Sequence, residues 1–340
     1  MSNAAVLEHP GVAVEPSSSA RVFAGAVLCL AAAAALLAGW APLGFSIVIV
    51  FLFAGPHNWF EARYFLTRLP GRWGKLRNYF VFGLGGVAVL TASFIALPWL
   101  GSTWQWTTDE WTTASAFWNT SFIIWVMVLI QMRSKQNPRR DWFWTVPVGF
   151  TLLALTWMAT EAWELGLVYL HPLMALWILD RELKRSKPEW RAAYHGCLAV
   201  VPLFLMLLYW RLADAPALPG TDALSVRIAW HAGAGILSDV SVHFLVAAHA
   251  FLEMLHYSVW LIAIPLITFG AAPWRLNSIP MARRSASWKW GIAGVIALGG
   301  LIVLGLWACF LADYPATRDL YFTMAIFHVL AEFPFLLRSL

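Results

Sequence analysis

The chain has 340 residues, of which 60% are hydrophobic and only 12% are Asp, Glu, Lys or Arg. A water-soluble domain cannot bury so much apolar surface, so the composition excludes a soluble enzyme and predicts a polytopic, all-α membrane protein. The net charge of +5 does not indicate a nucleic-acid partner, because the basic residues lie in short segments between apolar stretches.

The first 20 residues are rich in Pro, Ser and Ala and predict a flexible tail. Residues 21–340 are then one transmembrane helical domain. A membrane span needs roughly 20 apolar residues. About ten spans are predicted, at residues 22–41, 44–66, 79–100, 114–132, 142–160, 163–180, 192–212, 241–269, 290–312 and 320–337.

Basic residues follow every second span. The four clusters are Arg68, Arg72, Lys75 and Arg77; Arg133, Lys135, Arg139 and Arg140; Arg181, Lys184, Arg185 and Lys187; and Arg275, Arg283, Arg284 and Lys289. By the positive-inside rule both termini are therefore cytoplasmic, provided that residues 226–240 do not cross the bilayer. This topology predicts a multi-pass protein of the bacterial inner (cytoplasmic) membrane.

Histidine and glutamate recur together inside these apolar stretches. The pattern HxxxE occurs three times, as His57/Glu61, His249/Glu253 and His328/Glu332. Residues three, four or seven positions apart share one helix face, so His249, Glu253 and His256 form one stripe. By the predicted span limits His57, His171, His256 and His328 all fall near the middle of the membrane.

Ionisable side chains are costly at this depth and usually face a bundle interior, where they have a function. An intrahelical hydrogen bond explains a single HxxxE pair, but three pairs and His171 at one depth favour a shared metal site. The predicted metal ligands are His57, His171, His249, His256, His328, Glu61, Glu253 and Glu332, and the three glutamates are also the candidate catalytic groups. His195 is assigned no such role, and His231 either borders an outer entrance or is solvated in a loop.

Imidazole and carboxylate ligands without thiolate suit iron(II), manganese or zinc. All three cysteines, Cys29, Cys197 and Cys309, lie in apolar runs and are interpreted as small hydrophobic residues. Iron(II) is the favoured cofactor, because two histidines and a carboxylate with open positions are the usual site of non-haem oxygenases. Another divalent metal or haem remains an alternative.

The bundle also resembles the Brp/Blh family of membrane β-carotene dioxygenases. The resemblance depends on a histidine that follows Gly-Pro on an early span (Gly55, Pro56, His57) and on His249 and His256 on one later helix. It implies a non-haem iron held by transmembrane histidines and a substrate that enters from the lipid. The segment HNWFE is also similar to the H-x-W-x-E stretch by which nitric oxide reductases hold non-haem iron.

These observations predict a non-haem iron oxygenase or oxidoreductase that acts on a lipid-soluble substrate within the bilayer, with no nucleic-acid partner. Two alternatives remain open. A haem-binding protein for electron transfer or assembly needs only one or two axial histidines. A transporter of protons, metal ions or solutes can use buried His and Glu side chains as a relay. Walker A, GxSxG and HExxH motifs are absent from the sequence.

Overall fold

The computed structural model describes residues 18–137, 142–216, 222–269 and 275–339, and within these ranges every regular element is a helix. The predicted all-α bundle is therefore confirmed. The predicted N-terminal tail lies almost wholly outside the described residues. Of the described helices, nine are long and apolar enough to cross a membrane. Their helical cores are α1 (Ser18–Trp40), α2 (Pro42–Arg68), α3 (Arg77–Trp104), α4 (Thr108–Gln136), α6 (Thr160–Ser186), α7 (Arg191–Leu212), α9 (Val242–Ser258), α10 (Ala286–Ala312) and α11 (Tyr314–Ser339).

The range predicted as the fifth span, 142–160, contains a shorter helix. Helix α5 (Thr145–Met158) has 14 residues, or about 21 Å, which is less than the roughly 30 Å of a bilayer core. Ala159, with φ −152°, interrupts the helical geometry between α5 and α6. The predicted end at residue 160 is close to this interruption, but residues 142–144 are apolar and precede the helix, so the predicted range is longer than the helix.

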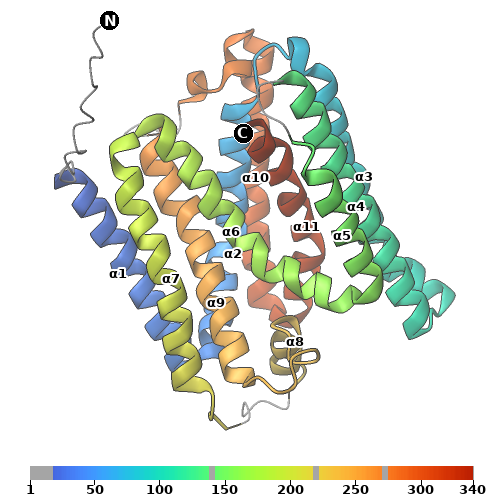
Figure 1. Ribbon diagram of the computed structural model, residues 1–340. Coiled ribbons are helices and arrows are strands. Elements are labelled where there is room, and N and C mark those ends of the chain that lie inside the picture. Colours follow the sequence, from blue (N-terminus) through green and yellow to red (C-terminus); the bar gives the residue numbers. More distant parts are fainter. Residues whose placement is uncertain (1–17, 138–141, 217–221, 270–274, 340) are drawn as a thin grey trace, which may run out of the picture.

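Residues 226–240, which were predicted not to cross the membrane, contain only a short helix. They contain most of helix α8 (Ala223–His231), which has nine residues and is too short for a span. The side chain of Asp222 caps α8 by accepting hydrogen bonds from the backbone N–H groups of Leu224 and Ser225. Figure 1 shows α8 at one end of the bundle.

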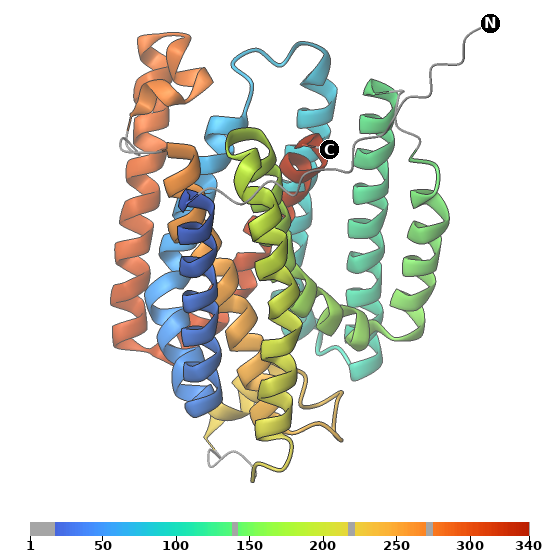
Figure 2. The ribbon, with the colours of Figure 1, turned by 60° about the vertical axis from the view of Figure 1, so that its left-hand side comes forward.

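Helix α9 lies at the centre of the bundle, and 61% of its apolar window is buried. It packs against α1, α2, α6 and α7, while α11 packs against α2, α3, α4 and α10. Figures 1 and 2 show α1 and α7 along one side of the molecule, and α3, α4 and α5 along the other. Side chains that α2, α9 and α11 direct inward therefore meet in the interior.

Glycines allow close contact between these helices. A Cβ atom at Gly299 of α10 would lie 2.7 Å from the Trp59 indole of α2, and one at Gly86 of α3 would overlap Trp125 of α4. Small residues at helix crossings are typical of membrane bundles, because they allow backbones to approach.

Helix α9 is continued by two π-helical turns, η3 (Val259–Ala263) and η4 (Pro265–Phe269). Pro265 has no backbone N–H and its ring crowds the preceding turn, which disturbs regular α-helical bonding. The wider turns begin three residues after His256, and π-helical turns are frequent near functional sites.

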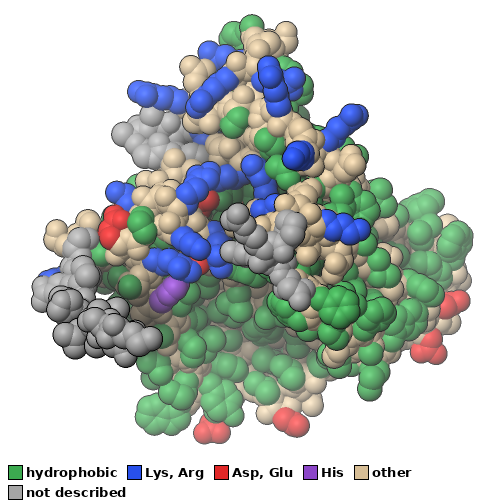
Figure 3. Space-filling model, turned by 45° about the horizontal axis from the view of Figure 1, so that its top comes forward, with side chains coloured by type: hydrophobic (Ala, Val, Ile, Leu, Met, Phe, Trp, Pro, Cys, Tyr) green, Lys and Arg blue, Asp and Glu red, His purple; other side chains and the backbone are tan. Residues whose placement is uncertain are grey.

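Lysine and arginine side chains gather at one end of the molecule, which Figure 3 brings forward. Four 3-10 turns also connect helices: η1 (Gly74–Leu76), η2 (Pro188–Trp190), η5 (Leu276–Ser278) and η6 (Pro280–Arg283). Helix α1 begins and α11 ends at this basic end, opposite α8 (Figure 1). The arrangement agrees with the charge pattern from which cytoplasmic termini were predicted.

Candidate metal centre

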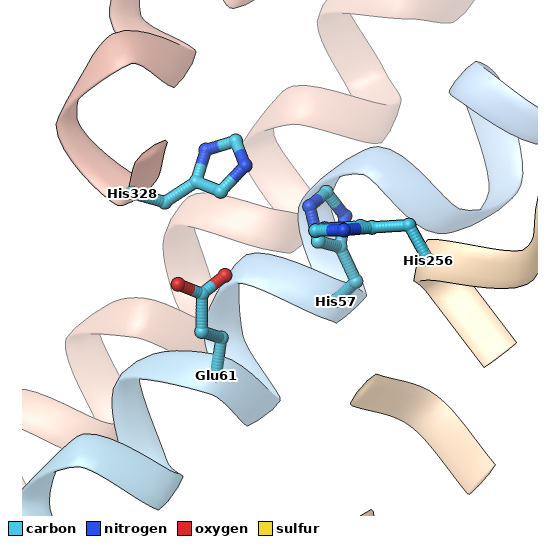
Figure 4. A group of neighbouring side chains, drawn as sticks. All are labelled: His57, Glu61, His256 and His328. Atoms are coloured by element: carbon cyan, nitrogen blue, oxygen red, sulfur yellow. The ribbon is translucent and has the colours of Figure 1, made fainter. Parts of the chain in front are cut away.

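Four predicted ligands from three helices meet in the bundle interior. His57 and Glu61 come from α2, His256 from α9 and His328 from α11, and one ligand atom of each lies within 4.8 Å of all the others. Figure 4 shows the four side chains around one small region. His57 and His256 are 1% and 2% exposed and Glu61 is fully buried. Distant parts of the chain thus form one buried His/Glu group.

The hydrogen bond of His57 determines which of its nitrogens faces this group. Its Nδ1 lies 2.9 Å from the carbonyl oxygen of Phe53, one helical turn earlier. A carbonyl only accepts hydrogen bonds, so Nδ1 carries the proton and Nε2 presents a lone pair. Such a bond at one ring nitrogen is the usual way in which a protein orients a metal-binding imidazole.

Several polar atoms of the group have no hydrogen-bond partner among the described residues. They are Nε2 of His57, both ring nitrogens of His256, Nδ1 of His328 and both carboxylate oxygens of Glu61. Buried polar atoms are nearly always paired, and each exception needs an explanation. One ring nitrogen of each histidine and the carboxylate fit a divalent cation, which would take up one lone pair from each of the four residues.

The dimensions also fit one ion. Nitrogen and oxygen ligands lie about 2.1 Å from a zinc ion, so ligands on opposite sides of such an ion are about 4.2 Å apart. The largest separation within the group is at most 4.8 Å. Small side-chain movements therefore suffice to close the four groups around a cation.

His171 of α6 lies beside the group, although it is not one of the four. Its Nε2 is 3.1 Å from Nε2 of His328, and its ring centroid is 4.5 Å from that of His256. Its Nδ1 lies 3.3 Å from a carboxylate oxygen of Glu332. Glu332 is fully buried and is placed to orient His171, as carboxylates do behind metal-binding histidines.

His249 and Glu253 lie apart from the four-residue group. His249 is one to two turns closer than His256 to the α8 end of the bundle, and its Nδ1 is 3.7 Å from Glu253. Its ring lies 5.0 Å from that of His231 in α8, and Tyr257 donates a 3.3 Å hydrogen bond to Glu253. We name His231, His249, Glu253 and Tyr257 the outer polar cluster. The single stripe predicted on α9 thus divides between this cluster and the candidate metal centre.

Sequence reasoning missed two ionic groups near the basic end of the bundle. Buried Glu182 of α6 accepts a 2.7 Å hydrogen bond from Tyr64 and pairs with Arg68, both of α2. Asp180 pairs with Arg191 through contacts of 2.7 and 3.0 Å. Glu182 and Arg68 lie on different helices, as do Asp180 and Arg191, so no local spacing identifies these two pairs.

His195, which was assigned no role in the metal site, contributes to the second of these groups. Its Nε2 lies 2.7 Å from the Asp180 carboxylate. Arg191 and His195 are four residues apart in α7 and therefore share a helix face. That spacing is the one signal that could have indicated a common anionic partner.

Comparison with known proteins finds no significant match: no family model fits the chain, and neither a curated protein nor a solved structure is similar to it. Inference about function therefore depends on the geometry of the site.

Proposed function

We propose that the protein is a membrane-embedded non-haem metalloenzyme that uses iron(II) to oxidise or cleave a lipid-soluble substrate. One observation supports this proposal above all others. Three imidazoles and a carboxylate from α2, α9 and α11 converge within 4.8 Å, and all four residues are buried. Histidine and carboxylate ligands that leave open positions are typical of non-haem iron oxygenases.

The residues of the centre have separate parts in this proposal. His57, His256 and His328 bind through neutral ring nitrogens, and the Glu61 carboxylate balances part of the ionic charge. His171 either adds a nitrogen ligand or holds His328 in position, because neighbouring ligands of one metal are about 3 Å apart, as are the two Nε2 atoms. A bound iron(II) ion would supply open coordination positions for dioxygen.

The surroundings of the centre are apolar and aromatic. The ring of Tyr257 lies 4.5 Å from that of His57, and Trp260, one turn beyond His256, is fully buried. Side chains of this kind exclude bulk water and accept an apolar chain better than a charged solute. They favour a substrate that enters from the lipid, as in the membrane carotenoid dioxygenases that the sequence resembles.

Haem is a poorer fit to the same residues. A porphyrin provides four ligands in its own plane and leaves two axial positions for the protein. Here a carboxylate and three imidazoles share one small volume, so two of them would occupy the space of the macrocycle.

Transport is favoured by a different observation, the outer polar cluster. Its residues extend from α8 to Tyr257, whose ring packs against His57. A row of buried ionisable groups between an outer surface and a buried site is a feature of proton and ion pathways. The metal content of the purified protein distinguishes the two functions, because the proposed enzyme requires bound iron and a transporter does not.

Iron content and the optical spectrum of the detergent-purified protein test the proposal. The variant H256A/H328A loses two ligands and is expected to retain less than about a tenth of the iron. His195→Ala is the matched control, since His195 binds Asp180 and should leave the iron content unchanged.

About one iron per chain, no Soret band and loss of iron in the double variant alone would support the enzyme and lead to a screen of lipid-soluble substrates. A Soret band that disappears in the double variant would show that these histidines bind haem and not an iron(II) ion. If neither the unchanged protein nor the double variant contains metal after anaerobic reconstitution with iron(II), the metalloenzyme proposal is wrong. Transport is then the remaining function.

A further inference from the structure

Two long stretches of the chain contain basic but no acidic residues. Residues 62–108 include five Lys or Arg, residues 254–312 include four, and neither stretch contains Asp or Glu. Each positive charge in them needs a counterion from elsewhere. Glu182 provides one for Arg68, whereas the connection between α2 and α3 and the start of α10 have none within their own segments.

The fold brings these two stretches together around one surface pocket. Arg72, Trp73 and Arg77 line it from the α2–α3 connection, and Arg284 and Trp288 line it from the start of α10. The pocket has a volume of about 460 Å³, which is large enough for a lipid headgroup. We name it the arginine pocket.

The walls of the arginine pocket are held together by close packing. A Cβ atom at Gly71 would lie 3.2 Å from the carbonyl oxygen of Pro280 in η6, so the α2–α3 connection lies directly against η6. Gly74 has φ +48°, a left-handed conformation that glycine adopts without strain. Beneath the pocket, Ile279 and Met281 pack with Ile292 in a small apolar core.

Within the described part of the chain, the three guanidinium groups have no acidic partner. Among the described residues, no carboxylate lies within 4 Å of Arg72, Arg77 or Arg284. The Arg284 guanidinium lies 5.5 Å from the centre of the Trp288 ring, which leaves its N–H groups available. The pocket therefore combines three positive charges, which attract anions.

Its position indicates an anion that belongs to the membrane. Trp288 is 44% exposed, and tryptophan is enriched at the level of lipid headgroups. Below it, α10 is the least buried of the nine long helices, with 11% of its apolar window covered. Val295 and Leu298 of α10 are more than half exposed and offer a surface for an acyl chain.

We propose that the arginine pocket binds the phosphate of an anionic phospholipid whose acyl chains lie along α10. Basic pockets at the cytoplasmic side of membrane helices recognise such headgroups. The phosphate accepts hydrogen bonds from the three arginines, and Trp73 and Trp288 contact the glycerol region. The site is separate from the His/Glu group and does not depend on its chemistry.

Native mass spectrometry and lipid titration of the delipidated protein in neutral detergent test this site. The probe is phosphatidylglycerol, with phosphatidylcholine as the lipid without net charge and inorganic phosphate as the soluble anion. The variant R72Q/R77Q/R284Q is expected to bind phosphatidylglycerol at least about tenfold more weakly at low salt. The matched control K75Q/R283Q/K289Q removes the same total charge from the same two stretches, at residues that do not line the pocket, and should bind within about twofold of the unchanged protein.

If both variants lose phosphatidylglycerol binding to the same extent, the lipid is attracted by overall charge. That result would overturn the proposal of a specific site in the arginine pocket. Equal binding of phosphatidylcholine, or displacement of phosphatidylglycerol by millimolar phosphate, would overturn the choice of an anionic lipid. Iron content and the size-exclusion profile serve as checks of folding. An unchanged iron content in a variant that has lost lipid binding would confirm that the two sites are independent.

Discussion

Glu61 and Glu332 both lie beside histidines, but their contacts give them different roles. Both oxygens of Glu61 and both oxygens of Glu332 lack a hydrogen-bond partner among the described residues. Only the Glu61 carboxylate belongs to the four-residue group, whereas Glu332 lies outside it, 3.3 Å from Nδ1 of His171. Their positions therefore fit a ligand in the case of Glu61 and a group that orients an imidazole in the case of Glu332.

This difference predicts the effect of Glu332→Gln. The amide keeps the size of the side chain but removes the charge that orients His171, so metal affinity should fall about 10- to 100-fold. Glu253→Gln is the matched control, because Glu253 contacts His249 and Tyr257 of the outer polar cluster. The metal affinity of this variant should differ by less than about twofold from that of the unchanged protein. Equilibrium dialysis against iron(II) or zinc measures both.

A larger loss for Glu253→Gln than for Glu332→Gln would contradict these roles. It would place the metal in the outer polar cluster and not between α2, α9 and α11.

The candidate site was predictable only in part. Spacing of four residues determines that His57 and Glu61 share a face of α2, and the cost of burying them indicates that this face points inward. The meeting of His57 with His256 and His328 depends on how α9 and α11 both pack against α2. The contact of His249 with His231 depends on how α8 packs against α9. Such contacts join residues far apart in the chain, and no local pattern records them.

Among the helices, the contact between α3 and α4 depends on one of two adjacent glycines. A Cβ atom at Gly86 would overlap the indole of Trp125, whose Nε1 donates a 3.4 Å hydrogen bond to the carbonyl of Phe82. A Cβ atom at Gly85 would meet nothing within 4 Å. A side chain therefore has space at Gly85 but not at the neighbouring position, Gly86.

Gly86→Ala should therefore lower stability while Gly85→Ala should not. Forcing an extra carbon into a packed contact costs roughly 1–3 kcal/mol, of which the better helix propensity of alanine returns up to about 1 kcal/mol. Thermal unfolding in detergent should show a lower midpoint for Gly86→Ala and an equal or higher one for Gly85→Ala. Equal midpoints for the two variants would mean that Trp125 moves aside at no cost.

Helix positions were predictable along most of the chain because apolar length is a strong signal. Each of the ten predicted ranges contains a helix, and residues 226–240 contain only a short one. The exception is α5, whose 14 residues are too few for a span although its predicted range, 142–160, is long enough. Hydropathy measures composition and not backbone geometry, so it does not show that the apolar residues 142–144 precede the helix.

For the molecule as a whole, the gathering of lysine and arginine at one end predicts its orientation in the membrane. Glu189 and Asp214 are exposed acidic residues just beyond the two ends of α7. In a variant whose three cysteines are replaced, Asp214→Cys should react with a membrane-impermeant maleimide in intact cells. Glu189→Cys should react only after the cells are permeabilised, because it lies at the basic end, which the positive-inside rule predicts to be cytoplasmic.

The reverse labelling pattern would invert the bundle and place the arginine pocket on the outer face. Labelling of both cysteines in intact cells would show that α7 does not cross the membrane.

The convergence of α2, α9 and α11 also has a consequence for biosynthesis. His57 and Glu61 leave the ribosome nearly 200 residues before His256 and more than 260 residues before His328. During that interval α2 must remain in or beside the translocation machinery with a histidine and a glutamate that lack their final neighbours, at a cost in the lipid core. Helix α11 is the last of the three to be synthesised and completes the His/Glu group, so a chain truncated before α11 would enter the membrane with that group incomplete.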